Sequence, residues 1–163
     1  MIRRLTPTDE AAAELVLDEA LGGRVQARRG EVVDVLAHPA LGAFVGSDLA
    51  GLATYSVDLG GGGAELVALA VRSSHRRRGL GAALVDAAFE AAAASGSRRM
   101  WLITTNDNLT ALALYQRQGF RLVEVDAGAV DRARLLKPSI PDVGEHGIPV
   151  HDELMLERLT ERP

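Results

Sequence analysis

The 163-residue sequence contains no cysteine, which excludes disulfide bonds, thiolate metal sites and a cysteine nucleophile. Aromatic residues make up only 4%, and Lys137 is the single lysine among 18 basic residues, a preference that we attribute to coding bias. No apolar run approaches the ~20 residues of a membrane-spanning helix. Met1–Leu5 does not resemble a secretory signal. We therefore expect a cytoplasmic protein without a membrane partner.

Several functional signatures are also missing. No Gly-x-Ser-x-Gly segment is present, so serine hydrolase chemistry lacks its signature. A net charge of −4 does not provide the broad positive surface that nucleic-acid binding requires. Histidines occur without the i, i+4 or HExxH spacing of metal ligands, and we expect each to be a loop or surface residue. They are His38, His75, His146 and His151.

Length and composition indicate one soluble domain over residues 1–163, since 47% hydrophobic and 25% charged residues suit a single core. We expect a strand at Ile2–Leu5 and a helix from Thr8 or Asp9 through Ala20 that ends near Gly22-Gly23. A short helix is predicted around Val32–Leu36. The later strands are expected at Leu41–Val45, Leu49–Val57 after a turn at Gly46-Ser47-Asp48, Arg99–Thr104, Phe120–Val125 and Asp152–Leu159.

The segment from Ala64 to Gly96 joins a strand, an arginine and glycine turn and an amphipathic helix. Because first-turn N–H groups are unpaired within a helix, such a turn can bind phosphate oxygens. A P-loop is excluded because Ala82-Ala83 stand where Lys-Ser/Thr is needed. The dinucleotide fingerprint fails because its third glycine would fall on Leu84.

The spacing Arg76-x-x-Gly79-x-Gly81 resembles the pyrophosphate loop of the GNAT superfamily of N-acetyltransferases, and Asn108–Phe120 (NLTALALYQRQGF) resembles the family's Asn-x-x-Ala-x-x-x-Tyr-x-x-x-Gly-Phe segment. The resemblance implies an α/β fold with a mixed, mostly antiparallel sheet that splays near its centre and is flanked by helices. We expect Gly119 to end the helix of the second motif in a left-handed conformation.

The resemblance also implies a function. It predicts transfer of the acetyl group of the cosubstrate acetyl-CoA to a primary amine of a small molecule or peptide, by direct attack in a ternary complex. The alternative is a noncatalytic acyl-CoA-binding or sensing domain, and the sequence leaves open whether the protein is a homodimer. The implied cofactor-binding residues are Leu69, Ala70, Val71, Arg76, Arg77, Arg78, Gly79, Leu80, Gly81, Ala82 and Asn108.

Two side chains are candidates for catalysis. Tyr115 matches the family tyrosine that protonates or holds the departing CoA sulfur, and its alternative is a core tyrosine. Glu65, expected on the strand face of Val67, Leu69 and Val71, could accept the amine proton directly or through water. Its alternative is a solvated glutamate at the strand end. For Asn108, a contact with the pantetheine arm competes with a helix-capping role.

Asp126–Val150 is predicted to be a long loop between the last two strands, carrying three prolines. Loops of this length are often functional, and the resemblance implies that it borders the acceptor cleft. The alternative is a proline-stiffened cover over the sheet. Side chains at its end that could line the cleft are Glu145, His146, His151, Asp152 and Glu153.

Overall fold

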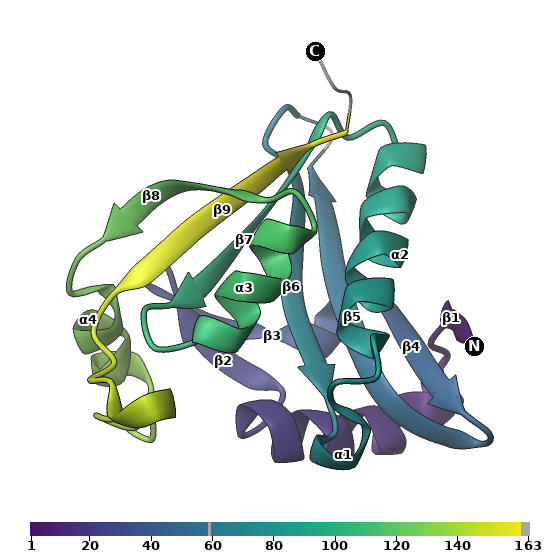
Figure 1. The fold of residues 1–163 in the computed structure, drawn as a ribbon, viewed down its shortest axis with the longest axis horizontal. Helices are drawn as coiled ribbons and strands as arrows, with labels where there is room; N and C mark the ends of the chain where they lie inside the picture. The colour runs from purple at the N-terminus through teal and green to yellow at the C-terminus, as the bar shows by residue number, and fades with distance from the viewer. Residues whose placement is uncertain (59, 161–163) are drawn as a thin grey trace. The chain divides into compact units, whose positions relative to one another are not determined.

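The computed structural model describes residues 1–58 and 60–160, which divide into two compact units. Unit 1 is built from the described residues of Met1–Arg24, Asp34–Met100 and Leu159–Pro163, and unit 2 from Val25–Val33 and Trp101–Arg158. Helices and strands are mixed along the chain, and the strands β4, β5 and β6 follow one another without a helix between them (Figure 1). No helix in the described ranges combines the length and apolar character that crossing a membrane demands.

Four antiparallel strands form the sheet of unit 1. Their spatial order is β1 (Ile2–Arg4), β4 (Ala40–Val45), β5 (Asp48–Asp58) and β6 (Gly63–Val71). The predicted turn between β4 and β5 is confirmed, with Gly46 at a φ of +62°. Positions 49–55 of β5 are all buried, so both faces of this central strand are covered.

Two helices cover the sheet of unit 1. α1 (Glu10–Leu21) follows the 3-10 turn η1 (Pro7–Asp9), and α2 (Leu80–Ala94) follows the 3-10 turn η3 (Ser73–His75). Both helices contact β5 and β6 (Figure 1). The predicted first helix is confirmed, and Gly22 ends it with a φ of +74°.

Gly51 of β5 explains how closely α2 and β6 approach this strand. A Cβ atom at Gly51 would lie 2.8 Å from the Ala70 carbonyl oxygen and 3.3 Å from Leu84 of α2. Any larger residue would therefore displace the backbone of β6. The absence of a side chain here permits the packing of the helix that carries the predicted phosphate-binding loop.

In unit 2, the strands lie in the order β7 (Arg99–Thr105), β9 (Glu153–Leu159) and β8 (Arg121–Asp126), of which β8 and β9 are antiparallel. α3 (Leu109–Arg117) connects β7 to β8, and Gly119 beyond it has a φ of +87°. The three predicted strands, the helix of the second motif and its left-handed glycine are therefore confirmed.

The prediction of a short helix around Val32–Leu36 is wrong. The chain instead forms a hairpin of β2 (Val25–Arg28) and β3 (Glu31–Asp34), followed by the 3-10 turn η2 (Val35–Ala37). Both turn residues have positive φ, 49° at Arg29 and 75° at Gly30, as a type I′ turn requires. Arginine is not a typical residue for the first of these positions, so the sequence carried no clear hairpin signal.

The prediction that Asp126–Val150 is a loop is also wrong in part, because it contains α4 (Ala129–Leu136) and the 3-10 turn η4 (Glu145–Gly147). α4 begins after Gly128, which has a φ of +76°. The helix has only eight residues, which is shorter than the window of about 11–18 residues over which helical periodicity is recognised in a sequence.

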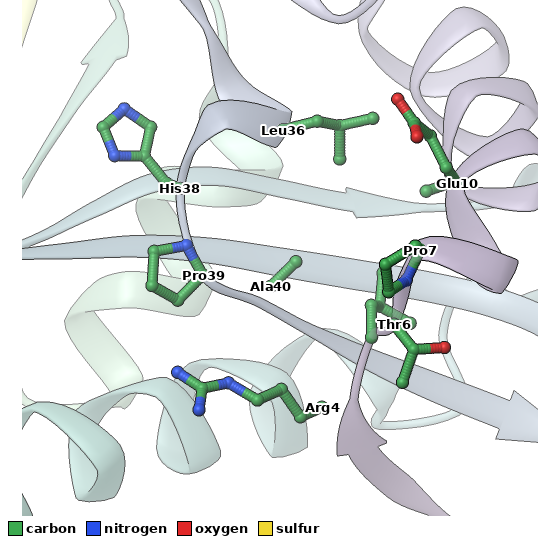
Figure 2. Close-up of a pocket in the computed structure, with 10 residues that line it drawn as sticks. Arg4, Thr6, Pro7, Glu10, Leu36, His38, Pro39 and Ala40 are labelled. Carbon is green, nitrogen blue, oxygen red and sulfur yellow. The ribbon is translucent and has the colours of Figure 1, made fainter.

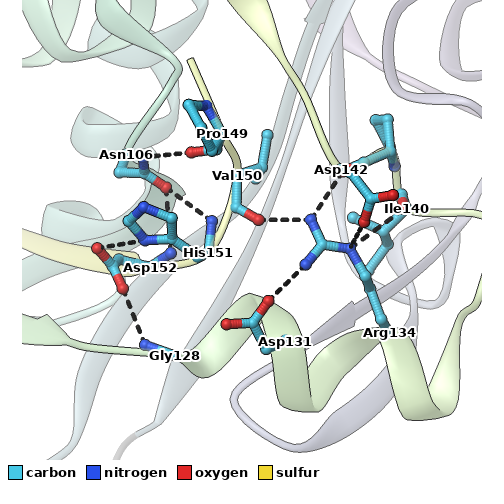
Figure 3. A network of polar contacts seen from close by, with 11 residues as sticks. Asn106, Gly128, Asp131, Arg134, Ile140, Asp142, Pro149, Val150, His151 and Asp152 are labelled. Atoms are coloured by element: carbon cyan, nitrogen blue, oxygen red, sulfur yellow. Dashed lines mark hydrogen bonds and ion pairs between the residues drawn. The ribbon is translucent and has the colours of Figure 1, made fainter.

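Arg134 of α4 holds the chain that follows the helix (Figure 3). Its side chain is 17% exposed and pairs with Asp131 at 2.7 Å. The guanidinium also donates hydrogen bonds to the carbonyl oxygens of Pro141, at 2.8 Å, and Val150. One arginine thus links α4 to both ends of the proline-containing segment.

Asn106 fixes the end of the same segment (Figure 3). Its Nδ2 donates to the Pro149 carbonyl at 2.9 Å, and its Oδ1 accepts from the N–H groups of His151 and Asp152, both at 3.1 Å. His151 pairs in turn with the Asp152 carboxylate at 2.7 Å. The segment before β9 is therefore held by specific polar contacts within unit 2.

Candidate functional site

The segment between β6 and α2 has the geometry of an anion-binding loop. Arg77 and Gly79 both adopt positive φ, 57° and 79°, so the chain turns sharply before α2 begins at Leu80. A Cβ atom at Gly79 would meet nothing within 4 Å, so this glycine serves the backbone angle rather than close packing.

The backbone N–H groups at the start of α2 precede the hydrogen bonds of the helix. The Ala83 N–H donates to the Gly79 carbonyl at 3.0 Å, so the N–H groups of Leu80–Ala82 come before the first such bond. The helix dipole makes this end attractive to an anion. Arg76–Arg78 are exposed beside it and add positive charge.

Glu19 of α1 anchors the beginning of this loop. Its carboxylate accepts hydrogen bonds from the Ser73 hydroxyl and N–H, both at 2.7 Å, and from Arg72 Nε at 3.1 Å. These contacts, with the Ser73 hydroxyl first, lower the pKa of Glu19 from 4.5 to about 2. Arg76 Nε donates to the Val71 carbonyl at 3.2 Å, so its side chain caps the end of β6.

Glu65, the predicted base, lies near the start of β6. It pairs with Ser56 of β5 and is 9% exposed, so it is not the solvated strand-end residue of the alternative interpretation. The prediction that it shares a face with Val67, Leu69 and Val71 is wrong. The alternation of side chains along β6 is interrupted between these residues.

A β-bulge causes the interruption. Ala68 pairs with Thr54, but the next pair joins Leu66 to Tyr55, which makes Val67 the extra residue. An extra residue moves the side chains beyond it to the opposite face. The predicted base therefore lies on the face of Ala68.

Asn108 occupies the N-cap position of α3 in unit 2. Its Oδ1 accepts a hydrogen bond from the Ala111 N–H, and its Nδ2 donates to the Thr104 hydroxyl, both at 3.3 Å. These are the contacts that a helix-capping role predicts for Asn108. The contact of Asn108 with a pantetheine arm stays a prediction.

Tyr115 lies two turns further along α3 and is 8% exposed. Its ring meets the Phe120 ring edge to face, with centroids 5.9 Å apart and an interplanar angle of 60°. Burial raises the pKa of the Tyr115 hydroxyl above its ordinary value. The hydroxyl therefore keeps its proton at neutral pH, as a proton donor must.

The predicted residues thus fall into two sets. Unit 1 holds Glu65, Leu69–Val71 and the loop Arg76–Ala82, which are joined by one strand and one turn. Unit 2 holds Asn108 and Tyr115 on one helix. No three His, Cys, Asp or Glu side chains of the described residues are grouped to hold a metal ion.

Asp107 was absent from the predicted site although it joins two segments of unit 2. One carboxylate oxygen accepts from the Thr105 hydroxyl at 2.5 Å and the other from the Glu145 N–H at 3.1 Å. A Cβ atom at Gly144 would collide with this carboxylate. In the sequence, the neighbouring Asn106, Asp107 and Asn108 all look like helix caps, and only their contacts distinguish them.

Glu153 lies under the turn of the β2–β3 hairpin. It is 4% exposed and accepts from the Arg29 N–H at 3.2 and 3.3 Å. The Arg29 guanidinium lies 5.0 Å over the Trp101 ring. A cavity of about 50 Å³ here is also lined by Glu124 and Asp126. A volume this small holds a few water molecules at most.

The chain is similar in sequence to known acetyltransferases. The pattern of the Acetyltransferase (GNAT) family matches residues 12–120. The chain is 38% identical to the uncharacterized protein YdhI of Bacillus subtilis (strain 168), over 70% of this chain and 69% of that protein. It is 29% identical to streptothricin acetyltransferase of Streptomyces lavendulae, over 76% of this chain and 65% of that protein. The chain belongs to the GNAT acetyltransferase family.

Solved structures agree on the fold. A Bacillus subtilis acetyltransferase in complex with CoA has a TM-score of 0.78 at 24% identity, with 98% of both chains covered. Nourseothricin acetyltransferase has a TM-score of 0.71 at 23% identity, with 99% of this chain and 98% of that chain covered. The predicted α/β class, with a mostly antiparallel sheet flanked by helices, is confirmed.

Proposed function

We propose that this protein transfers the acetyl group of acetyl-CoA to a primary amine of a small molecule or peptide, by direct attack in a ternary complex. Membership of the GNAT family, together with the Arg76–Ala82 loop at the start of α2, carries this proposal. Similar proteins include acetyltransferases named for streptothricin and for ribosomal protein S18, so the acceptor class stays broad. We also propose a cytoplasmic enzyme without a membrane partner, and the net charge of −4 supports the absence of a nucleic-acid partner.

Acetyl-CoA binding is assigned to both units. The pyrophosphate would accept hydrogen bonds from the N–H groups of Leu80–Ala82 beside Arg76–Arg78. The pantetheine arm would follow the backbone of Leu69–Val71 and contact Asn108, with the Val71 N–H polarising the thioester carbonyl. Similar proteins have been solved with CoA and with acetyl-CoA bound, which supports this assignment.

The chemistry then needs two proton transfers that involve side chains, one to Glu65 and one from Tyr115. Glu65 accepts a proton from the amine, directly or through water, and the amine nitrogen attacks the thioester carbonyl carbon. The new C–N bond forms as the C–S bond breaks. Tyr115 donates its proton to the departing thiolate and regains one from solvent. The buried, protonated state of Tyr115 supports the second role.

A combined binding and turnover experiment tests the proposal. Calorimetry measures acetyl-CoA affinity, and release of free CoA is followed with amino acids, aminoglycosides, other small amines and peptide N-termini. Acetyl-CoA binding with release on at least one amine supports the proposal. Binding without release on any of them indicates the noncatalytic acyl-CoA-binding alternative.

A further inference from the structure

A cavity of about 280 Å³ in unit 1 contains none of the residues assigned to acetyl transfer. The end of β1, the turn η1 and the start of α1 form one side, and the connection from η2 to β4 forms the other (Figure 2). Sites for drug-sized ligands have volumes of about 300–1,000 Å³. This cavity therefore fits a smaller organic molecule.

Two side chains with N–H donors interrupt a largely apolar wall. Arg4 and His38 line the cavity, and Figure 2 places them on either side of Pro39. Neither the Arg4 guanidinium nor the His38 ring makes a hydrogen bond or ion pair with any residue in the ranges 1–58 and 60–160. The apolar wall is formed by Leu5, Pro7, Ala13, Leu36, Pro39 and Ala40.

Two carboxylates of this region are already paired with Arg24. Glu10, which also lines the cavity, pairs with Arg24 at 3.0 Å. Asp34 pairs with Arg24 at 2.8 Å, and the hydrogen bonds from Arg24 lower the pKa of the Asp34 carboxyl. The positive charge of Arg4 therefore remains available at the cavity. A guanidinium offers a carboxylate two parallel N–H donors.

We propose that this cavity binds a small organic monocarboxylate. Its carboxylate lies against Arg4 and His38, and its short apolar body packs against Leu36 and Ala40. Inorganic phosphate would pair with Arg4 but leave the apolar wall in contact with water. This site is independent of the proposed acetyl transfer, and its ligand binds in the absence of acetyl-CoA.

The probe for this proposal is 3-methylbutanoate, titrated into the full chain by NMR and calorimetry without acetyl-CoA. We expect saturable binding, with shift changes at the cavity residues. The neutral 3-methylbutanamide and inorganic phosphate should each bind at least tenfold more weakly, because one lacks the charge and the other the apolar body. Equal binding of either compound, or no binding of 3-methylbutanoate, overturns the proposal.

Variants distinguish ligand binding in the cavity from a general effect of positive surface charge. Arg4→Gln should weaken 3-methylbutanoate binding about tenfold or more, and Ala40→Leu should abolish it by filling the cavity. Arg121→Gln removes the same charge from the exposed strand β8 and should leave binding unchanged. Thermal unfolding establishes that each variant is folded, and His38→Gln replaces Arg4→Gln if that variant is not. Unchanged binding in a folded Arg4→Gln variant overturns the proposal.

Discussion

Tyr115 is the residue at which the proposed chemistry is most directly tested. Tyr115→Phe keeps the ring that packs edge to face on Phe120 but removes the proton. Turnover should fall about 10²- to 10⁴-fold, the usual contribution of a general acid. Acetyl-CoA affinity, measured by calorimetry, should change little. Wild-type turnover in this variant would remove Tyr115 from the mechanism.

Replacement of Glu65 should change the pH dependence of the rate in a way that replacement of Tyr115 does not. Near neutral pH most alkyl amines are protonated, so loss of the base in Glu65→Gln should depress turnover strongly. Raising the pH deprotonates the amine in solution and should partly rescue this variant. Tyr115→Phe, measured alongside, should stay slow across the same range. An unchanged rate profile in Glu65→Gln would assign the base to solvent or to another residue.

Glu19 makes the anchoring of the loop depend on pH. Its pKa falls from 4.5 to about 2 on folding, so its contribution to stability is complete above pH 4.5 and is lost as the pH falls to 2. Urea unfolding should show Glu19→Gln to be less stable than wild type at pH 6. The difference should shrink towards pH 3. Glu90→Gln, on the exposed side of α2, is the control and should show no such trend.

At the scale of an element, Arg134 is expected to stabilise the segment that follows α4. Its hydrogen bonds hold both ends of the segment after α4, so Arg134→Met should destabilise that segment by about 1.5–3 kcal/mol. Hydrogen exchange of residues 138–150 should accelerate. Arg132→Met, on the same helix, removes an exposed pair with Asp126 and should leave stability close to that of the wild type. Equal exchange in the two variants would contradict the role of Arg134.

Elements with strong local signals were predictable from the sequence, and the others depended on distant partners. The loop before α2 and the left-handed Gly119 follow from residue types within a few positions. The turn at Arg29 has no such signal, because arginine does not favour positive φ. Its hairpin is held instead by contacts with Trp101 and Glu153, more than 70 residues away in the sequence.

Dependence on a distant partner also explains why the strand face of Glu65 was predicted wrongly. Alternation along a strand predicts a face only while the register is continuous, and the register of β6 is fixed by its pairing with β5. The bulge at Val67 is not marked by glycine or proline. Motif spacing therefore selected the residues of the predicted site, whereas the face on which Glu65 lies depends on the pairing of β6 with β5.

At the scale of the whole molecule, the proposed function requires a ligand that both units bind. Acetyl-CoA at a hundredfold excess over Kd should stabilise the protein by about 2.7 kcal/mol. For a chain of this length that corresponds to a Tm increase of roughly 5–11 °C. Such an increase by itself does not show which residues are in contact with the ligand.

Hydrogen exchange with and without acetyl-CoA resolves the contribution of each unit. The ligand should slow exchange around the loop Arg76–Ala82 in unit 1 and along α3, from Asn108 to Tyr115, in unit 2. Gly81→Asp should abolish both effects and most of the Tm increase, because its carboxylate would occupy the phosphate position and repel the ligand. Ser47→Asp adds the same charge at the exposed β4–β5 turn and should retain both. Protection confined to unit 1 would leave phosphate binding intact but contradict the role of Tyr115 at the CoA sulfur.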